Sequence, residues 1–338
     1  MTPRISVNME QARRMGQHLV ALNWKSAGYD TINDALPQGC TGEQAIDYFF
    51  FTSMLLFDFK NIETILPDGT YLKGTNVFFH LAKHAPEIRP DFWSAAGLAA
   101  MTDDDYRTAF SLERDPARPT MPRMDERIAI LRDAAAGLLK HWRGSTSRLL
   151  TAYPNLKTED GSGLLEIVRR TFKGYDDPLY KKQFVFLKAL DVTGRWGPQD
   201  PENVQMPVDY HVIRLALRNG IVTVNDPTLA NALRGNQPCS AEDEALLRTA
   251  IMTAYDEMIR SAGLSVYFVD EVFWLIGRSC CHYARPPRCT TCDFSDCSVQ
   301  PAFGYTCPGL CPLAGACLGA RDEQYRSLLE PNVVTTYY

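Results

Sequence analysis

The sequence predicts a mostly α-helical globular protein, and three observations lead to this expectation. Apolar residues recur at helical spacing over much of the chain. Segments that alternate between apolar and polar residues, as half-buried strands do, are few and short. The 338 residues are 45% hydrophobic and 22% charged, which is typical of a folded protein with a large core and excludes a disordered chain.

The first half of the chain is predicted to be a series of helices interrupted by one hairpin. Asn8 suits the N-cap of the first helix, and Thr102 before three aspartates is a second clear helix start. The turn at Pro67–Thr70 separates two short segments that can pair as antiparallel strands. The predicted helices lie at residues 7–22, 44–57, 77–83, 92–100, 103–110 and 121–142, and the strands at 63–66 and 70–73.

The second half is also predicted to be helical, and it holds no membrane span. The longest apolar stretches, 48–59 and 266–277, are each too short to cross a bilayer, and the first residues lack the apolar core of a signal peptide. We therefore expect a cytoplasmic protein without membrane contact, and a monomer. The helices predicted here lie at residues 164–172, 179–190, 242–261 and 265–277, with one more directly after Asp209.

The helix after Asp209 carries the main candidate for catalysis. Pro207 suits the start of a helix, Asp209 stands where a side chain accepts free backbone N–H groups, and Gly220 ends the helix. The backbone dipole at such a position favours the ionised carboxylate. An ordinary helix cap remains the alternative.

The residues around Asp209 resemble a known catalytic segment, and the whole chain resembles a second family. The pattern V-D-x-H-V-x-R at Val208–Arg214 resembles the segment with the catalytic aspartate of helix-hairpin-helix DNA glycosylases. The order of landmarks along the chain resembles the queuosine salvage family, which are nucleotide N-glycosidases with a helical glycosylase-like fold. These landmarks are VNMEQARRMGQHL at 7–19, the aromatic run at 48–59, PDGTYLKG at 67–74, the segment 93–102, MPRMDERIAIL at 121–131, FVFLKAL at 184–190, VDYH at 208–211 and FVDEVFW at 268–274.

The resemblances imply a fold and a domain organisation. The chain is identified as a distant member of the queuosine salvage family with features of iron–sulfur helix-hairpin-helix DNA glycosylases. This implies a helix-hairpin-helix DNA-glycosylase-like fold with a C-terminal cysteine-rich metal-binding loop. We expect a catalytic domain at residues 1–277, as one body or as two intimate subdomains, then the loop at 278–320 and a tail at 321–338.

Both resemblances imply that Asp209 is the catalytic residue. A fixed carboxylate can stabilise the positive charge that forms on the sugar, or activate the attacking water, when an N-glycosidic bond breaks. No lysine stands clearly in the position used for strand cleavage, which favours a hydrolytic mechanism over one through an imine. The family normally has an aromatic residue two positions before this aspartate, and Pro207 stands there instead, so we expect an altered base pocket.

The salvage resemblance also implies a set of substrate-binding residues. Asp270 and Trp274 are four positions apart and share a helix face. An aspartate can accept the N–H groups of a purine-like edge, while an indole stacks on a flat ring. A surface aspartate beside a core tryptophan is the alternative. The remaining candidates are Phe186, Tyr210 and Lys188, the last of them for a polar or phosphate contact.

The cysteines form the strongest local signal. Eight of the ten fall within Cys280–Cys317. CHYARPPRCTTC at Cys281–Cys292 and CPLAGAC at Cys311–Cys317 resemble the two halves of the cluster loop of iron–sulfur DNA glycosylases. Thiolates at such spacing suit a [4Fe–4S] cluster or, alternatively, tetrahedral zinc. The candidate ligands are Cys281, Cys289, Cys292, Cys297, Cys307, Cys311 and Cys317.

Three functions fit these observations. The main hypothesis is a monofunctional DNA glycosylase that excises a modified base and leaves an abasic site, in repair or in defence against phage. Arg285 and Arg288 would then contact DNA phosphates, unless they only offset the charge of a thiolate-bound cluster.

The second hypothesis is an N-glycosidase that releases queuine from queuosine 5′-phosphate, a modified nucleotide. The whole-chain resemblance favours it, and so does the net charge of −5, which argues against broad binding to polyanions. A third hypothesis is a non-catalytic, metal-stabilised nucleic-acid-binding protein, in which Asp209 is only a cap.

Overall fold

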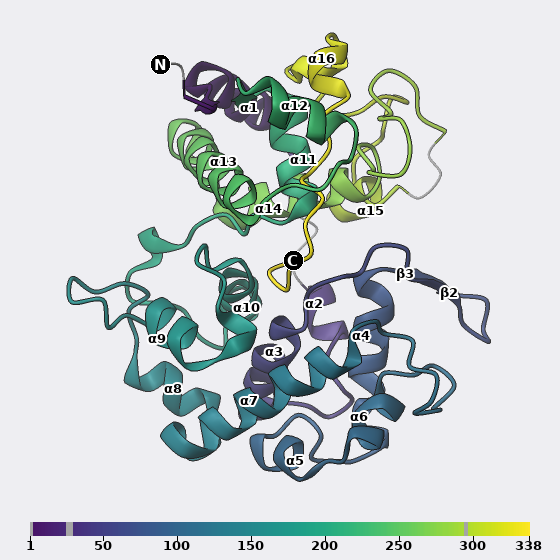
Figure 1. Ribbon diagram of the computed structural model, residues 1–338, viewed down its shortest axis with the longest axis vertical. Coiled ribbons are helices and arrows are strands. Elements are labelled where there is room, and N and C mark those ends of the chain that lie inside the picture. Colours follow the sequence, from purple (N-terminus) through teal and green to yellow (C-terminus); the bar gives the residue numbers. More distant parts are fainter. Residues whose placement is uncertain (1–2, 25–29, 294–296) are drawn as a thin grey trace. The chain divides into compact units, whose positions relative to one another are not determined.

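The computed structural model describes residues 3–24, 30–293 and 297–338, and these residues form two compact units. We call them the terminal unit, with residues 3–24, 205–293 and 297–334, and the middle unit, with residues 30–204 and 335–338. Helices dominate both units, so the mostly α-helical prediction is confirmed (Figure 1). The specific helix-hairpin-helix arrangement stays a prediction. By its contacts, the cysteine-rich segment belongs to the terminal unit.

The terminal unit joins the start of the chain to its last third. Strands β1 and β4 pair antiparallel, with Ile5 opposite Val224, and helix α1 packs along α13. Helix α11 packs against α14. The elements are β1 (Ile5–Val7), α1 (Met9–Leu22), α11 (Tyr210–Asn219), β4 (Val222–Val224), α12 (Pro227–Arg234), α13 (Ala241–Ala262), α14 (Val266–Arg278), α15 (Val299–Phe303), η4 (Leu318–Ala320) and α16 (Glu323–Arg326).

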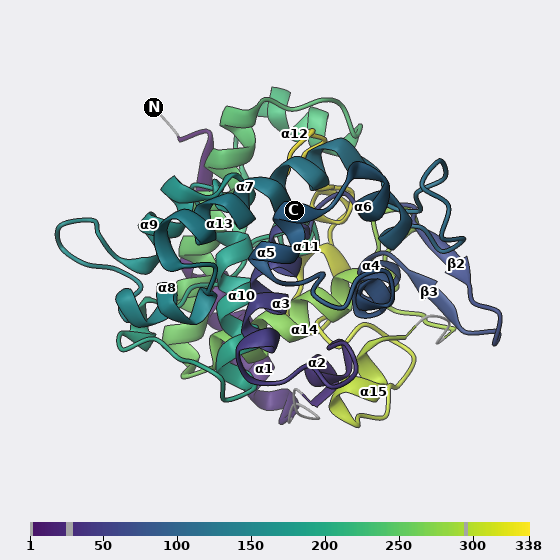
Figure 2. The ribbon, with the colours of Figure 1, turned by 90° about the horizontal axis from the view of Figure 1, so that it is seen from below.

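The middle unit surrounds a core rich in aromatic side chains. Helix α3 is central to it and packs against α7, α8 and α10 (Figure 2). The elements are α2 (Asp30–Asp34), α3 (Gly42–Met54), β2 (Glu63–Ile65), β3 (Tyr71–Lys73), α4 (Thr75–His84), η1 (Ala85–Glu87), α5 (Ala95–Ala100), α6 (Asp103–Ala109), α7 (Met124–Trp142), α8 (Thr146–Ala152), α9 (Leu164–Thr171), η2 (Lys173–Tyr175), α10 (Lys181–Val192) and η3 (Pro201–Asn203).

Two buried basic side chains satisfy the carbonyls at the end of α3. The last carbonyls of a helix have no partner within the helix. Lys182 donates to Met54 O, and Arg127 donates to Leu55 O and Phe57 O, both at 2.6 Å. Burial lowers the pKa of Arg127 to about 9 and the pKa of Lys182 well below its usual range. These side chains therefore hold the turn after α3 in place.

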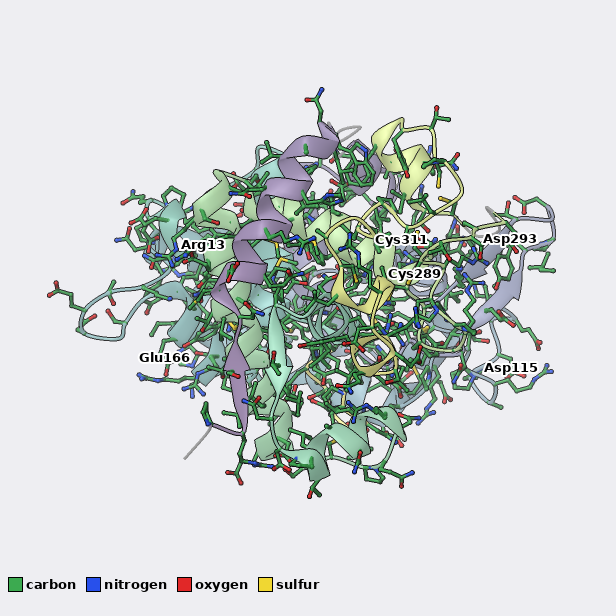
Figure 3. The ribbon with its side chains drawn as sticks, turned by 90° about the horizontal axis from the view of Figure 1, so that it is seen from above. Arg13, Asp115, Glu166, Cys289, Asp293 and Cys311 are labelled. Carbon is green, nitrogen blue, oxygen red and sulfur yellow. The ribbon has the colours of Figure 1, made fainter. Side chains whose placement is uncertain are left out.

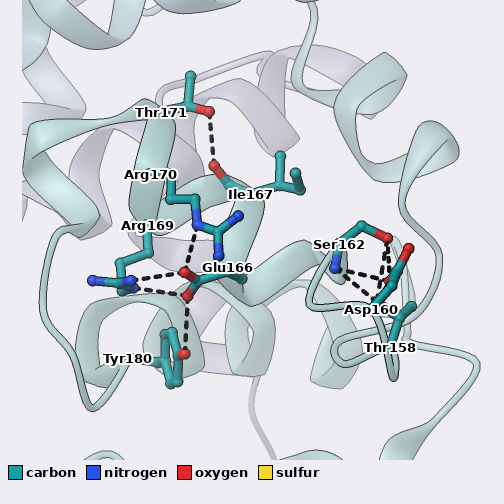
Figure 4. A network of polar contacts seen from close by, with 9 residues as sticks. All are labelled: Thr158, Asp160, Ser162, Glu166, Ile167, Arg169, Arg170, Thr171 and Tyr180. Carbon is teal, nitrogen blue, oxygen red and sulfur yellow. Dashed lines mark hydrogen bonds and ion pairs between the residues drawn. The ribbon is translucent and has the colours of Figure 1, made fainter.

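A partly exposed polar network ties α9 to α10. Glu166 accepts hydrogen bonds from Arg169 and Arg170 on its own helix and from the hydroxyl of Tyr180 (Figure 4). These donors, Arg169 above all, lower the pKa of Glu166 to about 2. In the adjacent turn, Asp160 accepts hydrogen bonds from Thr158 and Ser162.

Most predicted elements are present, with shifted ends. Asn8 caps α1 by accepting from Gln11 N, and Thr102 forms a capping box at α6, as predicted. The predicted hairpin is present as β2 and β3. The prediction for 121–142 starts too early, because Arg123 has a left-handed backbone (φ 54°) and α7 begins after it.

Several short elements escape prediction. Strands β1 and β4 are three residues each, and α8 is seven residues long, so their sequence periods are too brief to be recognised. Helix α2 also lies outside every predicted helix. Among the residues described, no helix combines the length and the apolar character that crossing a membrane would need.

Candidate functional site

Asp209 is the N-cap of α11, as its place in the sequence predicts. Its backbone is extended, and its Oδ1 accepts a hydrogen bond from Val212 N at 3.0 Å. Gly220 ends the helix in the left-handed conformation (φ 77°). The Asp209 side chain is 8% exposed, so the carboxylate lies in a largely dry environment at a positive helix end.

Helix α14 presents a half-exposed face next to this cap. Asp270, Trp274 and Arg278 are spaced by four residues and are each partly accessible, whereas Val272, Phe273, Leu275 and Ile276 are buried. The guanidinium of Arg278 lies over the Trp274 ring, 4.4 Å from its centroid. Trp274 is therefore not a core residue, and its ring belongs to an accessible, charged face.

Helix α11 packs against α14, and charged residues of both helices act on Tyr255 of α13. Burial raises the pKa of Tyr255 on α13 well above its usual range, and the charges of Asp209 and Asp270 add to this effect. The Tyr255 hydroxyl donates to Val212 O at 3.4 Å. Burial lowers the pKa of Arg278, against the opposing field of Asp209. Asp209 and Asp270 thus lie near Tyr255, and Arg278, which contacts Trp274, lies near Asp209.

Two neighbours of Asp209 on α11 are buried and structural. Arg214 is fully buried and donates to Glu330 at 2.7 Å, to Gly277 O at 2.9 Å and to Cys281 O at 2.8 Å. It therefore joins α11 to the end of α14 and to the chain after α16. His211 is buried, and its Nδ1 faces Arg214 at 3.0 Å, so burial and this cation lower the pKa of His211 well below its usual range.

The other predicted substrate-binding residues are Tyr210, which directly follows Asp209 in the terminal unit, and Phe186 and Lys188. Tyr210 stacks close to His211, with ring centroids 4.1 Å apart, and its pKa is raised by burial. Phe186 and Lys188 belong to the middle unit. Phe186 is 2% exposed and packs against Phe50 and Tyr175, which places it in the core.

Five cysteines line one cavity of about 20 Å³ in the terminal unit. They are Cys280, Cys281, Cys289, Cys311 and Cys317, from the end of α14 and from the segments before η4. Cys311 N donates to Cys289 O at 3.2 Å, and Figure 3 shows these two residues side by side. Over the described part of the chain, no three His, Cys, Asp or Glu side chains are placed closely enough to hold a metal ion.

Four of the seven predicted metal ligands line this cavity. Cys281, Cys289, Cys311 and Cys317 line it, as does Cys280, which the sequence analysis did not include. The adjacent position of Cys280 and Cys281 is the signal that could have pointed to it. The cavity-lining residues do not include the other predicted ligands, which are Cys292, Cys297 and Cys307.

Arg285 and Arg288, the two arginines predicted to bind DNA, both make contacts within the protein. The Arg288 side chain is 13% exposed and lies 3.1 Å from Asp293, which is labelled in Figure 3. Its backbone N–H donates to Cys280 O at 2.8 Å. The Arg285 guanidinium donates to Ser279 O at 3.5 Å. Both contacts tie the segment after α14 to the cysteine cavity.

Comparison with known families identifies the relationship of the chain. A sequence model described as queuosine salvage protein matches residues 37–263, more than half of the chain. The chain belongs to the queuosine salvage protein family. The match includes Asp209 and ends before α14, so the Trp274 face and all the clustered cysteines lie beyond it. No curated protein matches the chain.

Membership of the queuosine salvage family favours the second sequence-based hypothesis over the first. The match supports a modified nucleotide as the substrate, whereas nothing in it supports DNA as a partner or a resemblance to DNA glycosylases. The main hypothesis of a DNA glycosylase is therefore replaced by nucleotide salvage as the better-supported function.

Proposed function

We propose that this protein is an N-glycosidase that hydrolyses the base–sugar bond of a queuosine-type nucleotide and releases the free base. Family membership supports the substrate class. The observation that carries the proposal is the position of Asp209, a buried carboxylate at the start of α11, beside the accessible face of α14 with Asp270 and Trp274.

The reaction adds water across the bond between C1′ of the sugar and a ring nitrogen of the base. As this bond breaks, positive charge develops on the sugar and negative charge on the base. The Asp209 carboxylate stabilises the sugar cation, or it takes a proton from the attacking water. The hydroxyl then joins C1′, and the proton ends on the base. Water supplies every atom that is added, so no cofactor takes part in this step.

Binding is assigned to the face of α14. The Trp274 ring stacks on the flat base, and the Asp270 carboxylate accepts hydrogen bonds from the N–H groups on its edge. Arg278, which lies over the Trp274 ring, holds that ring in place by a cation–π contact. The buried Arg214–Glu330 pair and the Tyr255 hydrogen bond support α11 from behind and keep Asp209 in position.

The proposal is tested by offering the purified protein three substrates in parallel. These are queuosine 5′-monophosphate, the unphosphorylated nucleoside, and a duplex DNA that contains a 7-deazaguanine base. Released base is identified by mass spectrometry, and the reaction is run in ¹⁸O-labelled water. We expect base release from a free queuosine compound, with the label found in the sugar.

Two results would overturn the proposal. Release of base from the DNA alone would restore the DNA-glycosylase hypothesis. Absence of release from all three substrates, by a protein that binds queuosine monophosphate, would favour a non-catalytic binding function.

A further inference from the structure

We propose that the cavity between α11, α14 and η4 is a metal centre held by the thiolates of Cys281, Cys289, Cys311 and Cys317. Five cysteines line the cavity, and the four proposed ligands are those that also belong to the motifs CHYARPPRCTTC at Cys281–Cys292 and CPLAGAC at Cys311–Cys317. Four thiolates are the ligand set of a [4Fe–4S] cluster and of a structural zinc ion, so the ligand chemistry is the same for both.

The backbone fixes these cysteines independently of any metal. Cys281 N donates to Ile276 O at 2.9 Å, and Arg214 donates to Cys281 O. Gly220 lets η4 approach the end of α11, because a Cβ there would meet Leu318 Cδ1 at 2.3 Å. Cys317, directly before η4, consequently reaches the same cavity, and its Sγ lies 3.4 Å from Arg218 O.

One buried polar side chain at the cavity has a donor group that a metal centre could use. Asn219 lines the cavity and is fully buried, and among the described residues neither Nδ2 nor Oδ1 of its side chain has a hydrogen-bond partner. Unpaired buried amide groups are costly, and an Nδ2–H group can donate to a metal-bound sulfur. This is the kind of contact that surrounds thiolate centres.

Positive charge also gathers at the cavity. Arg218 is 5% exposed, and it donates to Cys281 Sγ at 3.1 Å and to Leu328 O at 2.8 Å. Arg326 lines the same cavity. A buried guanidinium is best balanced by an anion, and a metal-bound thiolate at Cys281 is such an anion. Arg326 is also paired with Glu323, so the thiolate at Cys281 would serve as the counter-charge of Arg218.

Binding of a metal would require the thiols that line the cavity to move closer together. In the described residues, the thiols surround a cavity and are not drawn to one point as around a bound ion. Cys280 is the spare fifth cysteine, in contact with Cys311. The four proposed ligands are separated in sequence by seven, twenty-one and five residues. The first follows α14 and the last precedes η4, so metal binding would hold the segment between these two elements in place.

The test measures metal in the full chain, purified without chelators and without oxygen. We expect either about four iron and four sulfide per chain, or about one zinc. The iron result comes with a brown colour and the zinc result without one, which distinguishes the two metals. Protein that contains neither metal, and that does not take up iron with sulfide, zinc or cobalt on reconstitution, would overturn the proposal.

Serine variants then test the ligand set. Cys281→Ser, Cys289→Ser, Cys311→Ser and Cys317→Ser should each lose most of the metal, whereas Cys292→Ser, a matched change in the same segment outside the cavity, should keep it. Equal metal loss in Cys292→Ser would overturn the assignment. For any variant that does not fold, thiol titration of the wild-type protein answers the question instead. Removal of the metal should expose about four additional thiols, and an unchanged count contradicts the proposal.

Discussion

At Trp274, stacking is expected to contribute to substrate binding more than to bond cleavage. The ring lies on the accessible face of α14, below the Arg278 guanidinium. Loss of one base–aromatic stacking contact costs about 1–3 kcal/mol, so Trp274→Ala should raise KM for queuosine monophosphate by about 5- to 150-fold, with a smaller change in kcat.

The conservative variant separates this role from a structural one. Trp274→Phe keeps a flat ring and should recover most of the affinity. Steady-state kinetics on both variants provides the comparison. A KM in Trp274→Ala equal to that of the wild type would remove the ring from the binding site.

Single residues at the site were predictable where a local rule fixes them. Asp209 was recognised as a cap because the cap, the helix and its glycine end are contiguous in sequence. The contacts of Arg214 were not predictable in this way, because Glu330 and Cys281 are distant from it in sequence and the pairing depends on the tertiary fold. For the same reason, the sequence analysis did not predict that Cys280, Asn219 and Arg218 line one cavity.

At the scale of helices, the buried ion pair of Arg214 and Glu330 should be the main polar interaction that holds α11 in the terminal unit. Both side chains are nearly inaccessible, at 0% and 4% exposure. Arg214→Met leaves the Glu330 carboxylate buried without its cation, which typically costs about 3–5 kcal/mol. We expect a loss of this size in the free energy of unfolding measured with urea.

A surface pair in the same unit is the control for that experiment. Arg13 joins α1 to Glu257 on α13 at 2.6 Å, but its side chain is 58% exposed. Arg13→Met should therefore cost less than about 1 kcal/mol. If Arg214→Met costs no more than the control, the proposed support of α11 is wrong.

The Glu166 network between α9 and α10 should make the middle unit sensitive to acid. The folded-state pKa of Glu166, about 2, lies below the model-compound value of 4.5. The network therefore stabilises the fold above that ordinary value and loses its effect as pH falls toward 2. Because the groups are partly exposed, Glu166→Gln should cost only about 0.5–1 kcal/mol at pH 7.

Urea unfolding at neutral pH and near pH 3 checks this dependence. The gap between wild type and Glu166→Gln should narrow at the lower pH, while Glu159→Gln, an exposed change in the preceding loop, should matter little at either pH. A gap that widens on acidification would contradict the assigned direction of the Glu166 pKa.

For the whole molecule, sequence patterns predict the helical class but not the two units. Long helices such as α7 and α13 have enough turns for their apolar period to be recognised. The terminal unit depends on the pairing of Ile5–Val7 with Val222–Val224, across more than two hundred residues, which no local period reveals. The sequence analysis expects a catalytic domain at 1–277, as one body or as two intimate subdomains, and the contacts describe two units, one of which joins the chain's beginning to its last third.

The chemistry of the whole molecule was partly predictable for a similar reason. The order of short motifs indicated the queuosine salvage family, and the family match over residues 37–263 confirms that relationship. The cysteine pattern pointed instead to DNA glycosylases, because such patterns report ligand chemistry and not the substrate. The proposed substrate class and the proposed metal centre thus rest on separate parts of this chain.

The central claim, that Asp209 cleaves the base–sugar bond, is tested most directly by single-turnover base release in Asp209→Asn. Asparagine caps a helix about as well as aspartate, so the cap on Val212 N and the fold should survive while the negative charge is lost. Loss of that charge should slow base release on the order of a hundredfold or more, with thermal unfolding and nucleotide binding close to wild type. Base release at the wild-type rate by this variant would show that Asp209 is only a helix cap.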